Sequence, residues 1–309
     1  MFSRFARAAA CLSFLVAIWV HPAHATECDN YQTVHPQWLW CDSFESDSAI
    51  NTNYFDVDRA SGRMALSSDS PFDGSYSLQM QYVPGQDDSG SIKLSLGATP
   101  VSPLRYTDQK FDELYWRFYM KMSSNWTGQP FKTTRGIVFA GSDWSEAAIG
   151  HLWEDSATSL GMGLDPASGV VGSTVVTTGY NDFAHLTWLG KQNGAFQVYA
   201  PANVNKWTCI EVHMKLNTPG SSDGLLAFSV NGQQQAQATN LNFRGSYTAY
   251  GINAILLESY SNGAVAPQVQ SRYFDNFVVS TQPIGCVAAG GTTPSAPPVP
   301  NPPTNVTVQ

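Results

Sequence analysis

The segment from Leu114 to Met122 constrains the fold more than any other part of this sequence. It reads Leu-Tyr-Trp-Arg-Phe-Tyr-Met-Lys-Met. Successive side chains of an extended strand point to opposite faces, so Leu114, Trp116 and Phe118 share one apolar face with the methionines. The alternate positions are aromatic or basic. This alternation is typical of a strand in a β-sandwich, with one face buried in the core.

The second face of this strand carries aromatic planes and cations. Pyranose rings stack on aromatic side chains, and sugar acids pair with cations. We therefore predict a glycan-binding face, with an open furrow above it, formed by Tyr115, Arg117, Tyr119 and Lys121. The alternative is that these residues occupy ordinary solvent-facing strand positions, where tyrosine and arginine are also common.

Other segments repeat the period of two. Residues 209–216 and 226–230 alternate, and Asn231-Gly232 after them favours a tight hairpin turn, because both residues tolerate positive φ. Residues 274–279 form another apolar segment. Long charged helical patterns are absent from the sequence. We predict an all-β fold, a two-sheet antiparallel β-sandwich of the jelly-roll type over residues 26–287.

The two ends of the chain differ in composition from this region. Arg4 and Arg7 precede an apolar run that is too short to span a bilayer, and Ala23-His24-Ala25 is typical of a signal-peptidase site. Residues 1–25 are therefore predicted to be a signal peptide, and the protein to be secreted, extracellular or periplasmic, without a membrane anchor. Residues 288–309 are rich in Pro, Thr and Gly and are predicted to be a disordered tail or linker.

The cysteines beyond the signal fit an oxidising compartment. Cys28, Cys41, Cys209 and Cys286 allow three pairings. Among these we favour Cys28–Cys41 together with Cys209–Cys286. The sequence has no Cys-x-x-Cys spacing, which argues against structural zinc.

The charge of the chain limits its partners. The net charge is −8, whereas nucleic-acid affinity depends on neutralising phosphates, so a nucleic-acid partner is not expected. An acidic glycan would gain no long-range attraction, and a local basic patch would have to bind it. We expect a monomer with a polysaccharide partner.

Several segments resemble the concanavalin A-like jelly rolls of the polysaccharide-lyase group that contains alginate and glucuronan lyases. The likeness covers roughly residues 40–287. The segments that carry it are residues 112–119, residues 207–220, Asp223-Gly224, Asn231-Gly232 and residues 273–280. The resemblance implies a β-sandwich, a glycan partner and cleavage of a uronate-containing polysaccharide by β-elimination.

The resemblance also implies site residues. Lys132 and Arg135 fall where a catalytic basic pair would lie, and Tyr199 is the candidate for a catalytic tyrosine. A structural calcium ion is implied between the early and the last strands, with Glu45 and Asp275 as ligands, because calcium prefers oxygen ligands. The alternative for Asp275 is that it only ends strand pairing.

Elimination from a uronate needs a cation beside the carboxylate and a base for the neighbouring proton. His213 is the predicted proton carrier, with His151 and His185 as further candidates. A surface pair of His213 with Glu211, a loop position for His151 and a core position for His185 are the alternatives. Trp126, Trp144, Trp153 and Trp188 either line a glycan cleft or close the ends of the sandwich.

Two further classes of function remain open. One is a noncatalytic glycan-binding protein that uses Tyr115, Tyr119 and tryptophans; the other is a surface-matrix protein. A retaining glycosidase is disfavoured, because the sequence has no strand with several acids at alternate positions.

Overall fold

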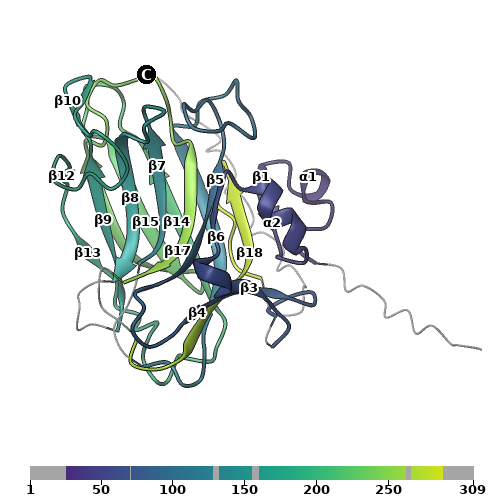
Figure 1. Ribbon diagram of the computed structural model, residues 1–309. Helices are drawn as coiled ribbons and strands as arrows, with labels where there is room; N and C mark the ends of the chain where they lie inside the picture. Colours follow the sequence, from purple (N-terminus) through teal and green to yellow (C-terminus); the bar gives the residue numbers. More distant parts are fainter. Residues whose placement is uncertain (1–25, 70, 128–131, 155–159, 262–265, 288–309) are drawn as a thin grey trace, which may run out of the picture.

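A computed structural model describes residues 26–69, 71–127, 132–154, 160–261 and 266–287. The predicted signal peptide and tail lie outside these ranges. Two large antiparallel sheets pack face to face, as Figure 1 shows. The predicted all-β sandwich is confirmed, and neither sheet closes into a barrel.

We call the first sheet sheet A. Its order is β16 (Gln233–Leu241), β15 (Gly224–Val230), β14 (Thr208–Lys215), β6 (Glu113–Met122), β18 (Gln270–Ser280), β4 (Ser77–Tyr82) and β3 (Met64–Ser67), and β1 (Trp38–Asp42) also pairs with β18. The predicted key strand, β6, therefore lies at the centre of this sheet.

The second sheet is sheet B. Its order is β12 (Thr187–Trp188), β9 (Met162–Ser168), β8 (Glu146–Glu154), β7 (Lys132–Phe139), β17 (Ala254–Tyr260), β5 (Asp88–Ser95) and β2 (Asp56–Asp58), and β13 (Gln192–Asn193) also pairs with β9. A separate small hairpin joins β10 (Val170–Val171) to β11 (Thr174–Val175). The helical elements are α1 (Tyr31–Val34), α2 (Asp47–Asn53) and the 3-10 helix η1 (Ala60–Gly62), and α1 and α2 lie beside β1 in Figure 1.

The core lies between the sheets. The apolar face of β6 is fully buried there, as the period of two predicts, and the indole of Trp116 donates to Thr134 Oγ1 of β7 at 2.9 Å. Gly136 faces the same indole: a Cβ at this position would lie 3.0 Å from the Trp116 ring. This glycine lets β7 approach β6 closely, so the large Trp116 side chain fits between the sheets.

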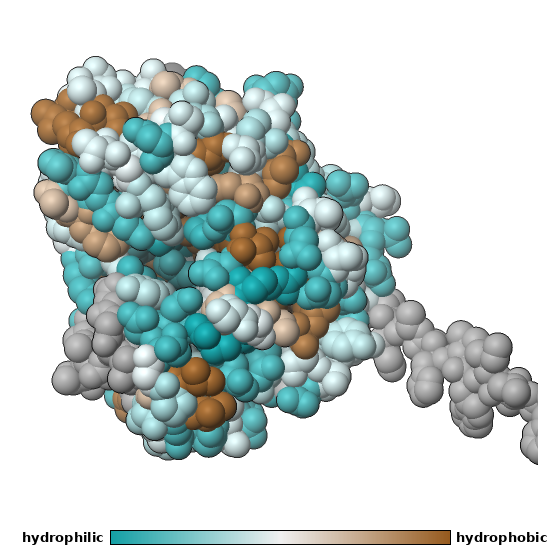
Figure 2. Space-filling view, viewed as in Figure 1, coloured by the Kyte–Doolittle hydropathy of each residue, from teal (hydrophilic) through white to brown (hydrophobic). Residues whose placement is uncertain are grey.

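The hairpin prediction is also confirmed. Asn231 and Gly232 connect β15 to β16 with φ values of 51° and 77°, the left-handed region that these residue types tolerate. Figure 2 shows a largely hydrophilic surface in which apolar side chains form small separate patches. The helices within the described ranges do not have the length and apolar character that a membrane span needs.

Candidate functional site

The outward face of β6 is covered rather than open. Arg117 is 0% exposed and Tyr119 is 2% exposed, and Lys121 is also buried. Tyr115 alone among the four predicted glycan-binding residues is partly exposed. The expectation of an open furrow over Arg117 and Tyr119 is therefore wrong.

Both ends of the described chain make this cover. Glu27 of the N-terminal segment accepts from Arg117 at 2.7 Å. Tyr119 stacks on Phe72 with a centroid distance of 3.6 Å, and its hydroxyl donates to the carbonyl of Val287 near the other end. Lys121 lies 5.3 Å from the ring of Trp207. The cations of this face thus bind protein groups.

The disulfides fasten these two segments. Cys28 is bonded to Cys41 of β1, and Cys286 is bonded to Cys209 of β14, with Cα–Cα distances of 5.3 and 6.0 Å. The favoured pairing is confirmed. Because both bonds join a terminal segment to sheet A, they explain why the face of β6 is covered.

The two predicted calcium ligands accept hydrogen bonds from one backbone turn. Glu45 accepts from the N–H groups of Ser75 and Tyr76, and Asp275 accepts from those of Phe72 and Asp73. Asp275 also accepts from the N–H group of its neighbour Asn276 on β18. Burial raises the pKa of Asp275 to about 8. Calcium prefers oxygen ligands, and calcium at these two carboxyls stays a prediction.

One predicted catalytic residue, His213, lies away from the basic pair, and a second, Tyr199, lies in the core with its hydroxyl 3.3 Å from Thr133 Oγ1 of β7. His213 is on the outer face of β14 in sheet A, where it bonds to Glu113 Oε1 at 2.7 Å rather than to Glu211. Tyr199 packs in the core and accepts from Arg272. Lys132 and Arg135 lie on β7 of sheet B, so the sandwich core separates them from His213.

The outward face of sheet B carries a groove of about 250 Å³. It crosses the strands β7, β17 and β5 and reaches the end of β2. Its described lining residues are Asp58, Asp88, Gly90, Ser91, Lys93, Lys132, Arg135, Tyr180, Asn181, Glu258 and Tyr260. The structure therefore places both predicted basic residues in one cavity.

Arg135 organises the floor of this groove. Its guanidinium donates to Glu258 Oε2 at 2.9 Å, to Asn181 Oδ1 at 2.7 Å and to the Tyr180 hydroxyl at 2.5 Å. Burial raises the pKa of Tyr180, so this phenol keeps its proton. Arg135 holds the side chains of Tyr180 and Asn181 in place, and its charge is already paired with Glu258.

Lys132 is enclosed by aromatic rings at the edge of the same groove. Its Nζ lies 5.0 Å from the ring centroid of Trp153, 5.1 Å from that of Phe183 and 5.1 Å from that of Tyr260. Cations bind such ring faces favourably, so the rings hold the ammonium at this edge of the groove.

His151 completes the cluster and lies on β8, directly opposite Arg135 in the strand register. Its Nδ1 lies 2.8 Å from the carbonyl of Asp165, which fixes the proton on Nδ1. Its Nε2 has no hydrogen-bond partner among the described residues. Burial, followed by the charge of Arg135, holds the pKa of His151 well below its usual range. The ring is neutral, with a lone pair on Nε2.

The tryptophans divide between the two alternatives. Trp153 stacks on His151 with a centroid distance of 4.0 Å, and Trp188 lies 5.6 Å from the same ring and is 41% exposed. Trp126 packs in the core, and Trp144 packs against Phe55. Trp153 and Trp188 thus lie at the candidate site, whereas Trp126 and Trp144 pack against other apolar side chains.

His151 lies on a strand and not in a loop, and Tyr180 and Asn181 are site residues that the sequence does not predict. The alternation Ile149-His151-Trp153 is the signal for a strand that places His151 beside β7. Tyr180 and Asn181 follow β11 in an irregular segment, and Asn181 has a φ of 59°. Their contact with Arg135 is long-range, and no local pattern predicts it. His185, the third histidine candidate, is exposed and bonds to Asp182.

Solved structures with the same fold include polysaccharide lyases. A marine PL-14 alginate lyase from Aplysia kurodai superposes with a TM-score of 0.55, at 16% identity, over 79% of this chain and 99% of that chain. An endo-β-1,4-glucuronan lyase from Trichoderma reesei has a TM-score of 0.49, at 13% identity, over 79% and 91% of the two chains.

A third structure, the alginate lyase vAL-1 from a Chlorella virus, has a TM-score of 0.47 at 15% identity, over 84% and 99% of the two chains. The superposition on the Aplysia kurodai lyase confirms, at the level of the fold, the resemblance predicted from the sequence. No protein-family model matches the chain, and no curated protein matches its sequence.

Proposed function

We propose that the protein is a polysaccharide lyase that cleaves a uronate-containing glycan in the groove of sheet B. The observation that carries the proposal is a neutral His151 beside two basic residues, with an Nε2 that has no hydrogen-bond partner in the described part of the chain. A base that is neutral near physiological pH can take a weakly acidic proton without first losing one of its own.

In this proposal Lys132 and the side-chain amide of Asn181 bind the uronate carboxylate. Asn181 suits this role because Arg135 holds its Oδ1, which turns its N–H groups away from the guanidinium. Neutralising the carboxylate lowers the free energy of the carbanion-like transition state. Arg135 acts as a positioning residue, because Glu258 pairs its charge.

The chemical step is a β-elimination. Nε2 of His151 takes the proton from the carbon next to the carboxylate, the electron pair forms a double bond, and the bond to the glycosidic oxygen breaks. Tyr180 donates its proton to the leaving oxygen. The phenol is suited to this because its raised pKa keeps it protonated and its oxygen accepts from Arg135.

One feature favours a second candidate, a noncatalytic glycan-binding protein. Lys132 is 3% exposed and His151 is 1% exposed, whereas Trp188 and Tyr260 are 41% and 36% exposed. A sugar can stack on the exposed rings of Trp188 and Tyr260, whereas the His151 ring is buried.

The same experiment separates both candidates. The purified protein is mixed with a panel of polyuronates, and absorbance of the unsaturated product is followed in the ultraviolet while binding is measured by tryptophan fluorescence. The lyase proposal expects an absorbance rise that is lost in His151→Ala. Quenching of fluorescence without any absorbance rise across the panel supports the binding protein and overturns the lyase.

We also propose that the protein works outside the cytoplasm. The support is the pair of disulfides, since such bonds persist in oxidising compartments. Release of the mature chain, starting near Thr26, into the periplasm or medium of an expressing bacterium is the test; a chain recovered with residues 1–25 still attached contradicts it.

A further inference from the structure

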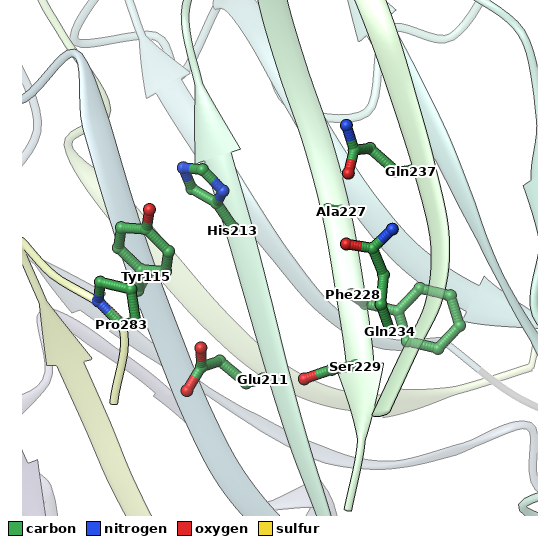
Figure 3. Close-up of a pocket in the computed structure, with 9 residues that line it drawn as sticks. All are labelled: Tyr115, Glu211, His213, Ala227, Phe228, Ser229, Gln234, Gln237 and Pro283. Carbon is green, nitrogen blue, oxygen red and sulfur yellow. The ribbon is translucent and has the colours of Figure 1, made fainter. Parts of the chain in front are cut away.

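A second groove lies on the opposite side of the molecule, on the part of sheet A that the terminal segments leave open. It measures about 170 Å³ and runs along β15. Figure 3 shows His213 and Glu211 of β14 on one side of β15, and Gln234 and Gln237 of β16 on the other.

Small residues on the central strand create this groove. Ala227 and Ser229 are the outward residues of β15, and their register partners are His213 and Glu211 on one side and Gln237 and Gln234 on the other. The small side chains form a floor, and the longer side chains of both neighbouring strands rise as walls. The strand register therefore builds the groove.

One wall ends in a stack of rings. Tyr115 stacks on His213 with a centroid distance of 4.0 Å and an interplanar angle of 11°, so one face of the imidazole is covered. Tyr115 and Pro283 line the same side of the groove in Figure 3. The other face of the His213 ring is turned toward β15, where it offers a flat surface to the apolar side of a sugar ring.

The C-terminal segment holds this wall in place. Glu211 accepts from the backbone N–H groups of Ile284 and Gly285 at 3.1 and 2.6 Å, which positions the adjacent Pro283. The disulfide from Cys286 to Cys209 fixes the same segment to β14. The wall is thus built by covalent and hydrogen-bonded contacts and does not depend on a mobile side chain.

The chemistry of the lining selects an uncharged ligand. Among the described lining residues there is no lysine or arginine, and Glu211 is the one carboxylate. Burial lowers the pKa of His213, so this ring supplies no positive charge near neutral pH. The exposed amides of Gln234 and Gln237 and the hydroxyl of Ser229 offer donors and acceptors that match sugar hydroxyls.

We propose that this groove is a second glycan-binding site, and that it binds one or two uncharged sugar residues of a neutral polysaccharide. Its volume is below the roughly 300–1,000 Å³ of sites that enclose drug-sized ligands, which fits a short stretch of a longer chain. The site would hold the protein on a neutral glycan while the groove of sheet B, which contains Lys132, faces an acidic one. The proposal does not depend on whether sheet B catalyses a reaction.

The test uses the full chain and defined oligosaccharides. Binding of neutral β-1,4-gluco- and manno-oligosaccharides, and of an oligoglucuronate as the acidic probe, is measured by isothermal titration calorimetry. We expect a neutral oligosaccharide to bind, and the double variant Gln234→Ala/Gln237→Ala to weaken this binding about tenfold or more, because two amide contacts are lost. Gln32→Ala, an exposed glutamine on α1, is the matched control and should bind like the natural protein.

A second variant fills the groove. Ser229→Tyr places a large side chain on its floor and should abolish neutral binding, with the folded state checked by near-ultraviolet circular dichroism. The proposal is overturned if no neutral oligosaccharide binds, if both variants bind as tightly as the natural protein, or if the oligoglucuronate competes for the same site.

Discussion

The outer faces of the two sheets carry similar residues and differ in what covers them. Each face has a buried arginine paired with a glutamate: Arg117 with Glu27 at 2.7 Å on sheet A, and Arg135 with Glu258 at 2.9 Å on sheet B. On sheet A the glutamate belongs to a terminal segment that closes the face. On sheet B it belongs to the neighbouring strand β17, and a groove remains.

The alternating pattern of a strand predicts two faces, but it does not indicate which of them is open to solvent. Tyr119 and Arg117 have the residue types of a sugar-binding surface, yet they anchor the N- and C-terminal segments. Lys132 and Arg135 are residue types that pair with sugar acids, and they line a cavity. The difference is decided by segments far away in the sequence.

Substitution of His151 should give the largest effect, because it tests directly whether sheet B is the reaction site. His151→Ala removes the proposed base, and loss of a general base lowers kcat by about 10²–10⁴-fold. The measurement is the rate of ultraviolet absorbance increase on a cleaved polyuronate. His35→Asn, a histidine that packs on Trp38 over sheet A, is the matched control and should keep full activity. Full activity in His151→Ala would contradict the proposal that the reaction takes place on sheet B.

The fold and the disulfide pairing could be predicted from the sequence, and the site could be predicted in part. The period of two in β6 and the Asn231-Gly232 turn are local signals, so they can be interpreted without knowledge of the rest of the chain. Lys132 and Arg135 came from the resemblance, and both line the groove. Tyr180 and Asn181 join Arg135 only through a contact spanning 45 and 46 residues, which no local pattern encodes.

Removal of the disulfides that fasten the terminal segments to sheet A should give the next largest effect, on the free energy of unfolding. The double variant Cys209→Ser/Cys286→Ser opens a loop with a sequence separation of 77, and the chain-entropy relation predicts a loss of about 4.5 kcal/mol in the free energy of unfolding. The matched variant Cys28→Ser/Cys41→Ser opens a separation of 13 and should lose about 3 kcal/mol. Urea denaturation measures both.

Activity on polyuronates should survive both disulfide variants at temperatures where they stay folded, because the groove of sheet B contacts neither bond. A loss of activity in a folded disulfide variant would show that the outer faces of the two sheets are coupled and do not act independently.

The two arginine pairs allow a direct test of the difference between the faces. Glu258→Gln leaves Arg135 buried without its counter-charge and should lower the free energy of unfolding by about 3 kcal/mol, at the low end for a broken buried pair because Tyr180 and Asn181 still bond to it. Glu27→Gln should cost a similar amount at Arg117. Only Glu258→Gln should also reduce kcat, since Arg135 positions Tyr180. Equal kcat values in both variants would contradict the role of Arg135 in positioning Tyr180.

Buried Glu146 on sheet B and half-buried Glu211 on sheet A each hold a neighbouring segment, and their titration should give the smallest effect. Glu146 accepts from the N–H group of Asn181 beside the groove, as Glu211 accepts from Ile284 and Gly285 on sheet A. Burial raises the pKa of Glu146 from 4.5 to about 7, and burial raises that of Glu211 in the same direction.

Because the native state binds this proton more tightly than the unfolded chain, the contribution of Glu146 is fully present below pH 4.5. It is lost as the pH rises through about 7. Glu146→Gln should remove on the order of 2–3 kcal/mol of pH dependence between pH 4 and pH 8, measured by urea denaturation at several pH values. Glu211→Gln should flatten the curve less. An unchanged slope in Glu146→Gln would mean that Glu146 is already ionised in the folded protein, and that the groove of sheet B is more strongly positive than its neighbouring carboxylates imply.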